Sequence, residues 1–147
     1  LGLVLRLVPG QAVTTFTRWI EWSPKDPEGY VARAQAYLTR RNKDPDRAIS
    51  DFTRAIAIQP KHVTAYLLRG NAYAAKKDLV RALADFDRLI AIVPEAWIAY
   101  TNRAWVYEQQ GKKSAAIRDL KEALRLNPNN KELARRLDAL TSNAGPR

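Results

Sequence analysis

The chain has 147 residues, of which 46% are hydrophobic and 27% are charged, a balance typical of a folded domain and not of a disordered segment. Lysine and arginine number 25 against 15 acidic residues, so the net charge of +10 favours acidic partners. The absence of cysteine excludes disulfides, and the single histidine, His62, excludes an ordinary zinc site.

The first twelve residues begin with an apolar run. Leu1–Val8 is interrupted by Arg6 and is far too short to span a bilayer. Pro9-Gly10-Gln11-Ala12 has the spacing of small residues found at signal-peptidase sites, but a charge such as Arg6 is unusual in a signal core. We therefore favour a segment of a longer protein over a processed signal remnant, and a soluble, cytoplasmic protein over an exported one.

Residues 10–22 carry a spacing of apolar side chains that returns three times downstream. Ala12, Phe16 and Trp19 stand four and three residues apart, and Pro24 follows five residues later. The later copies are Ala48, Phe52, Ala55 and Pro60; Ala82, Phe86, Leu89 and Pro94; and Ala116, Leu120, Ala123 and Pro128. The last three prolines are 34 residues apart, so the chain divides into a partial unit over 1–26 and three full units over 27–60, 61–94 and 95–128.

Each full unit opens with a second stripe of side chains at i, i+4 and i+7, which is one face of a helix about three turns long. These stripes are Tyr30, Ala34 and Tyr37; Tyr66, Gly70 and Tyr73; and Tyr100, Ala104 and Tyr107. The small residue in the middle of each stripe allows a second helix to approach closely. Each full unit is therefore predicted to be a hairpin of two helices.

Proline and glycine mark where these predicted helices end. Proline lacks an amide hydrogen and pushes the preceding residue out of the α region, so Gln59, Val93 and Asn127 are predicted helix ends. Gly111 and the polar stretch Lys76-Lys77-Asp78 are predicted to form the turns inside the third and second hairpins.

Residues 129–141 are predicted to form a capping helix at the end of the array. Asn129-Asn130 offers a helix N-cap, and Leu133, Leu137 and Leu140 then give one apolar stripe with charges elsewhere. The tail over 142–147 is small and polar and is predicted to fray.

This pattern resembles the tetratricopeptide repeat, Trp-x2-Leu-Gly-x2-Tyr…Ala-x3-Phe…Pro over 34 residues, across about 100 residues of the chain. The resemblance implies an all-α fold, a right-handed superhelical stack of antiparallel helix hairpins. Tyr replaces the first Trp of the pattern, and the first unit carries two extra residues within Arg40–Asp46. Arginine stands where the family usually has Leu, at Arg33, Arg69 and Arg103.

Each of these arginines has an aspartate on the second helix of its own unit, which gives the pairs Arg33–Asp51, Arg69–Asp85 and Arg103–Asp119. The arginines are either an anion-binding ladder or one half of three structural salt bridges. We favour the salt bridges, because arginine at partly buried sites is usually paired.

The next residue after each member of the first-helix stripe lies ~100° further round the helix, on a face that the second helix does not use. In the family this face lines a concave peptide groove, which here consists of Val31, Gln35, Leu38, Leu67, Asn71, Ala74, Thr101, Trp105 and Glu108. None of the nine is Lys or Arg, which argues against nucleic acid in the groove. Trp105 is either an interface anchor in the groove or a packing residue against the capping helix.

Some family members bind a partner's terminal carboxylate with two lysines, two asparagines and an arginine. Asn71, Asn102 and Arg136 are similar to three of these five groups, while Leu67 and Glu132 replace the lysines. Glu132 would repel a carboxylate, so we do not expect the complete clamp.

The sequence contains no phosphate-binding glycine loop, neither a Walker loop nor Gly-x-Gly-x-x-Gly. His62 lies in a predicted turn and is interpreted as a solvated helix-entry residue, not a catalytic base. We therefore expect no enzyme activity, no cofactor and no metal.

Protein–protein binding through the concave groove is the function that these residues favour. The first alternative is electrostatic binding of nucleic acid or anionic membrane, because Lys112–Arg136 carries eight basic residues against three acids. The second alternative is self-assembly through the apolar segment Leu1–Val8. The partner's identity cannot be inferred from the sequence.

Overall fold

The computed structural model describes residues 9–39 and 43–142, and the regular structure within them is entirely helical. The helices are α1 (Pro9–Trp22), α2 (Pro27–Tyr37), α3 (Pro45–Ile58), α4 (Val63–Ala75), α5 (Leu79–Ile92), α6 (Trp97–Gln109), α7 (Lys113–Leu126) and α8 (Lys131–Ser142). The predicted all-α fold is confirmed. No helix in this part of the chain has both the length and the apolar character needed to cross a membrane. Leu1–Val8, which we expected to favour self-assembly, lies outside the described residues.

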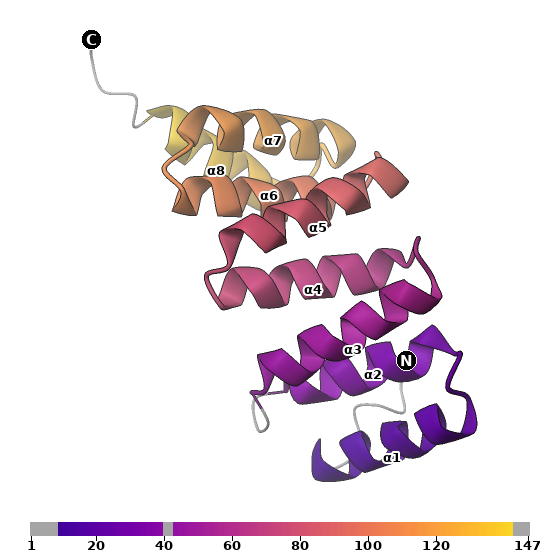
Figure 1. Cartoon of the computed structure of the whole chain (residues 1–147). Coiled ribbons are helices and arrows are strands. Elements are labelled where there is room, and N and C mark those ends of the chain that lie inside the picture. The colour runs from indigo at the N-terminus through magenta and orange to yellow at the C-terminus, as the bar shows by residue number, and fades with distance from the viewer. Residues whose placement is uncertain (1–8, 40–42, 143–147) are drawn as a thin grey trace.

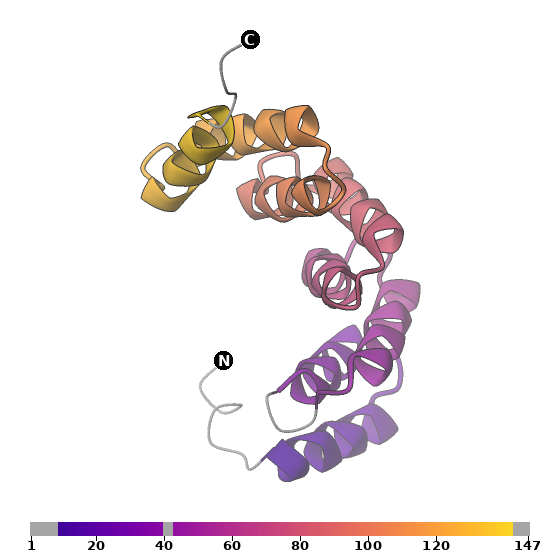
Figure 2. The same cartoon turned by 90° about the vertical axis from the view of Figure 1, so that its left-hand side faces the viewer.

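Helices that follow one another in the chain pack against each other (Figure 1). The hairpins are α2–α3, α4–α5 and α6–α7, with α1 before them and α8 after them. Figure 2 shows that the stack curves into an arc, with α2, α4 and α6 along its inner side and α3, α5 and α7 along its outer side. The first helix of each hairpin therefore supplies the concave face.

The crossing inside each hairpin sets a small residue of the first helix against a large residue of the second. At Gly70, a Cβ atom would lie 2.7 Å from Cε1 of Phe86, closer than real side-chain contacts allow. Phe86 and its counterparts Phe52 and Leu120 have no exposed surface. The middle residues of the predicted stripes lie in the core, whereas Tyr37, Tyr100 and Tyr107 are half-buried at its edge. The ring of Phe86 occupies the space that a side chain at position 70 would need.

The helix ends follow from the prolines and from the turn residues. Gln59, Val93 and Asn127 are the C-terminal caps of α3, α5 and α7, as predicted. In the turns inside the hairpins, Lys77 has a φ of 65° and Gly111 a φ of 71°, both in the left-handed region. Glycine adopts this conformation without steric cost, whereas a lysine does not.

His62 is not the solvated residue that the sequence suggested. It is 6% exposed and is the N-cap of α4, where its Nδ1 accepts a hydrogen bond of 3.3 Å from the backbone N–H of Ala65. Because Nδ1 accepts, the proton of the neutral ring is on Nε2, which lies 3.1 Å from Oε1 of Glu28 on α2. His62 therefore joins two neighbouring units, and its role is structural.

Helix α1 matches the second helix of a hairpin, with one correction. Ala12 and Phe16 are buried as the spacing predicted, but Trp19 is 39% exposed and Ile20 is buried instead. Among the described residues α1 packs against α2, where Ile20 lies against Gly29, while Trp19 is only partly covered.

Candidate functional site

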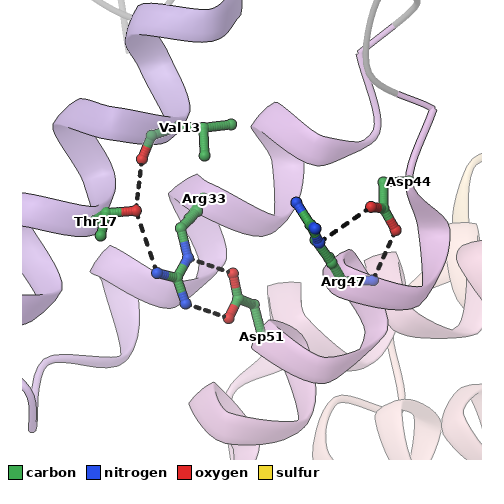
Figure 3. Close-up of polar contacts among 6 residues, drawn as sticks. All are labelled: Val13, Thr17, Arg33, Asp44, Arg47 and Asp51. Atoms are coloured by element: carbon green, nitrogen blue, oxygen red, sulfur yellow. Dashed lines mark hydrogen bonds and ion pairs between the residues drawn. The ribbon is translucent and has the colours of Figure 1, made fainter.

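The first set of functional candidates is the arginine row, which we define as Arg33, Arg69 and Arg103. Each guanidinium lies beside the aspartate predicted for it and donates two hydrogen bonds, one from Nε and one from Nη2. Figure 3 shows the arrangement at Arg33, where both distances to Asp51 are 2.8 Å. The corresponding distances are 2.9 and 2.7 Å from Arg69 to Asp85, and 2.7 and 2.8 Å from Arg103 to Asp119.

The third nitrogen, Nη1, reaches the second helix of the preceding unit. It donates to Oγ1 of Thr17 from Arg33 at 3.3 Å and to Oγ1 of Thr53 from Arg69 at 2.9 Å. Arg103 makes the equivalent contact with Asp87 at 2.6 Å. Each arginine thus connects its own hairpin with the one before it. Sequence reasoning missed these partners, although all three stand 16 residues before their arginine.

Aromatic rings and ion pairing complete the surroundings of the arginine row. The guanidinium of Arg69 lies 5.7 Å from the ring centre of Tyr66 and 5.9 Å from that of Tyr73. Burial is the largest single influence on Arg69 and opposes its charged form, but the hydrogen bonds to Asp85 and the negative charge of that carboxylate together outweigh burial and raise the pKa of the guanidinium. All three nitrogens of the group are already engaged, so the row is not arranged to receive an external anion.

The second candidate is a pocket on the concave side, between α4, α5 and α6. It has a volume of about 290 Å³ and is lined by Asn71, Ala74, Ala75, Phe86, Asn102 and Trp105, which we call the groove pocket. Nδ2 of Asn102 donates a hydrogen bond of 2.8 Å to Oδ1 of Asn71. Within the described residues, this leaves the amide NH₂ of Asn71 and Oδ1 of Asn102 without a partner. The pocket therefore offers one donor group and one acceptor group above an apolar floor.

Trp105 packs against residues of the second hairpin. It lies on the cluster that contains Tyr73, Ala74, Phe86 and Val106, whereas Leu133 of α8 belongs to a different cluster. The ammonium of Lys77 lies 5.3 Å from the centre of the Trp105 ring. Of the two roles considered for Trp105, this placement favours the one in the groove.

The other predicted groove residues are not equally accessible. Gln35, Leu38 and Asn71 are exposed, and a further group is half-buried: Leu67, Thr101, Asn102, Trp105 and Glu108. Ala74 is 7% exposed but still lines the groove pocket. Val31 was placed in the groove wrongly, because it is 4% exposed and packs in the core cluster that contains Ile20 and Ala65.

The C-terminal side of this face is closed by an ion pair. Nη2 of Arg136 lies 2.5 Å from Oε1 of Glu108, and both side chains are about a quarter exposed. Glu132 is exposed and lies 3.6 Å from Arg135. Arg136 is therefore paired with Glu108. Of the three residues similar to the family's carboxylate-binding groups, only Asn71 and Asn102 keep polar groups without a partner within the described ranges. Among the described residues, no group of three or more His, Cys, Asp or Glu side chains is placed to hold a metal ion.

Comparison with known proteins identifies the repeat. Two models of the tetratricopeptide repeat family match, one over residues 68–141 and the other over residues 31–96. No curated protein matches the chain.

Many solved structures share the fold, among them the following three. MamA (41-end) from Desulfovibrio magneticus RS-1 has a TM-score of 0.82 at 21% identity, with 92% of this chain and 75% of that chain covered. The first TPR of Spaghetti (RPAP3), bound to the HSP90 peptide SRMEEVD, has a TM-score of 0.76 at 21% identity, with coverages of 83% and 95%. YrrB, described as a TPR protein with an unusual peptide-binding site, has a TM-score of 0.77 at 23% identity, with coverages of 91% and 68%. At these identities the likeness concerns the fold.

Proposed function

The chain belongs to the tetratricopeptide repeat family, and from that premise we propose that it is a scaffold that binds an extended segment of a partner protein in its groove pocket. The observation that carries the proposal is the half-satisfied pair of Asn71 and Asn102 at the mouth of an apolar pocket. Two structures with the same fold are a domain bound to a peptide and a protein described as having a peptide-binding site, which supports the same class of ligand here.

The pair of asparagines suits a peptide backbone. The free amide group of Asn71 donates to a backbone carbonyl, and Oδ1 of Asn102 accepts from a backbone N–H. These two contacts position an extended chain without demanding a particular side chain. They stabilise the complex because each of the two groups otherwise bonds only to water.

The floor of the groove pocket supplies selectivity. A volume of about 290 Å³ between Phe86 and Trp105 accommodates one apolar side chain, whose burial contributes roughly 1.5–3 kcal/mol. Lys77 beside the Trp105 ring favours an acidic residue near that anchor, as does the net charge of +10. The proposed ligand is therefore an extended peptide with an apolar anchor and an acidic neighbour.

Selection of a random peptide library against the chain provides a ligand for the test. We expect the double substitution Asn71→Ala with Trp105→Ala to lower the affinity for the selected peptide by at least about tenfold, the loss typical of a central anchor. Gln35→Ala is the matched control, because Gln35 is an exposed amide of the same face one unit away. If the double variant is less folded than the parent chain, the single variant Asn71→Ala is measured in its place, and it too should bind the peptide more weakly.

The alternative site is a basic surface at the start of α7. Lys112, Lys113 and Arg118 line a shallow hollow there, and their charged groups form no ion pair with the described residues. The proposal is wrong if the variant Asn71→Ala with Trp105→Ala binds the peptide as tightly as the parent chain, while substitution of Lys112, Lys113 and Lys121 abolishes binding. The peptide site would then lie on this basic surface. Salt separates the two sites, because affinity for a polyanion falls steeply with ionic strength.

A further inference from the structure

The turn between α4 and α5 contains Lys77 in a backbone conformation that lysine rarely adopts. Its φ of 65° lies in the left-handed region, where the Cβ atom approaches the following carbonyl oxygen. The equivalent residue of the third hairpin, 34 residues later, is Gly111, which has a φ of 71° and no Cβ atom. Lysine at position 77 therefore makes the fold less stable than glycine would.

The side chain of Lys77 reaches the wall of the groove pocket. Its ammonium lies 5.3 Å from the centre of the Trp105 ring, within the range of a cation–π attraction. Trp105 belongs to the next hairpin and lines the groove pocket together with Ala75, the last residue of α4. The left-handed turn and the ring together hold a positive charge beside the space of the apolar anchor.

The other two hairpins do not combine a lysine with a ring in this way. Lys43, which stands 34 residues before Lys77, also has a positive φ, of 41°. The residue 34 positions before Trp105 is Asn71, so the first hairpin has no aromatic ring at the equivalent place. The third hairpin has Gly111 in its turn and therefore lacks the lysine. The two features coincide beside the groove pocket.

The carboxylates close to this turn are already paired with other cations. Asp78, the N-cap of α5, forms an ion pair with Arg81, and Asp46 at the start of α3 forms one with Lys76. Within the part of the chain that the structure describes, the ammonium of Lys77 forms no ion pair. Its N–H donors are therefore available to a carboxylate from another molecule.

We propose that Lys77 is a specificity-determining residue of the groove pocket, held by its strained turn to bind an aspartate or glutamate next to the apolar anchor of the partner segment. The inference rests on the proposed function and adds the place of the acidic residue and the effect on the fold. Asn71, Ala75 and Lys77 follow one another toward the end of α4, so the acidic residue lies on the turn side of the anchor, opposite the asparagine pair. A strained residue at a binding site lowers the stability of the free protein and raises the affinity of the complex.

Three variants, measured by calorimetric titration and thermal unfolding, separate the charge of Lys77 from its backbone conformation. Lys77→Gln removes the charge, and we expect it to lower the affinity for the library-selected peptide roughly threefold. Lys77→Gly removes both the charge and the strain, so it should bind as weakly as Lys77→Gln but unfold at a temperature about 2–4 °C higher. Lys77→Arg keeps the charge and should keep the affinity. Lys61→Gln is the control and should also keep it, because Lys61 is an exposed lysine in the turn before α4 and its loss changes the net charge equally.

Changes in the peptide test the contact from the other side. Selection against the parent chain should enrich Asp or Glu within about two residues of the apolar anchor, because an extended chain advances about 3.3–3.6 Å per residue. Replacing that acidic residue by its amide should weaken binding to the parent chain but not to Lys77→Gln. With Lys77→Glu, a peptide whose acidic residue is changed to lysine should bind more tightly than the original peptide.

Two results would overturn the role of Lys77. They are selected peptides without an acidic residue near the anchor, and a Lys77→Gln variant that loses as much affinity for the amide peptide as the parent chain does. The proposed function would survive either result if Asn71→Ala still weakened binding. Unchanged affinity in the variant Asn71→Ala with Trp105→Ala would contradict the proposed function itself, and the role of Lys77 with it.

Discussion

The arginine row and the asparagine pair of the groove pocket are both polar groups on the first helices of the hairpins, yet their hydrogen-bonding groups are used differently. Each arginine has every nitrogen of its guanidinium engaged, by an aspartate of its own unit and by a side chain of the preceding one. Asn71 and Asn102 form a single hydrogen bond with each other, and the other polar group of each amide has no partner among the described residues. The comparison suggests that saturated polar groups hold the units together, whereas half-satisfied groups at a pocket are available to a ligand.

The largest effect should follow from breaking the arginine row at its centre. Asp85→Ala leaves Arg69 half-buried without its main partner, which should lower the free energy of unfolding by about 2–4 kcal/mol. Chemical denaturation followed by circular dichroism measures the loss. The double variant Arg69→Ala with Asp85→Ala should be less destabilised than the sum of the two single variants, because it leaves no unpaired charge. Additive single effects would mean that the two groups act independently.

A comparable loss is expected at the hairpin crossing. Gly70→Leu places a side chain where Phe86 already lies, and the helices must separate at a cost of about 1–3 kcal/mol. Ala84→Leu is the matched control, because Ala84 is exposed on α5 and a leucine there meets no packed neighbour. A Gly70→Leu variant as stable as the parent would refute the pairing of the two helices at this crossing.

A smaller effect of opposite sign is expected at a helix cap. Asp26, His62 and Asn130 cap α2, α4 and α8 with side-chain acceptors, but the N-cap of α6 is Ala96, which has none. Ala96→Asp should therefore raise the free energy of unfolding by about 1 kcal/mol. Thermal unfolding measures the change, and an unchanged or lower midpoint would show that the backbone at Ala96 does not accommodate a cap.

The fold could be predicted from the sequence because its signal is repeated. Three copies of the same stripe identify the helices, and the prolines identify their ends, since both depend on neighbours within one helix. The contacts between units could not be predicted in the same way. The burial of His62 against Glu28, and of Val31 beside Ala65, depends on the angle between consecutive hairpins. No spacing within a single helix encodes that angle.

The candidate site was predicted less completely for a related reason. The sequence placed Asn71, Asn102 and Trp105 on one face, and the structure brings them together in the groove pocket. It did not indicate that Arg136 is paired with Glu108, nor that the arginine row contacts preceding units through partners such as Thr53. Those pairings join helices of different units and depend on how the side chains extend from them.

Our central claim is that the fully hydrogen-bonded arginine row stabilises the fold, whereas the partly bonded asparagines bind the ligand. The most direct test measures both stability and peptide affinity in two variants. Asn71→Ala removes one amide of the groove pocket, and Thr53→Val removes one contact of the arginine row while keeping the shape of the side chain. With a library-selected peptide, we predict that Asn71→Ala weakens binding severalfold or more and changes the free energy of unfolding by less than about 0.5 kcal/mol. Thr53→Val should lower stability by about 0.5–1.5 kcal/mol and leave the affinity unchanged. The reverse result, with the affinity lost on Thr53→Val and retained in Asn71→Ala, would contradict the account.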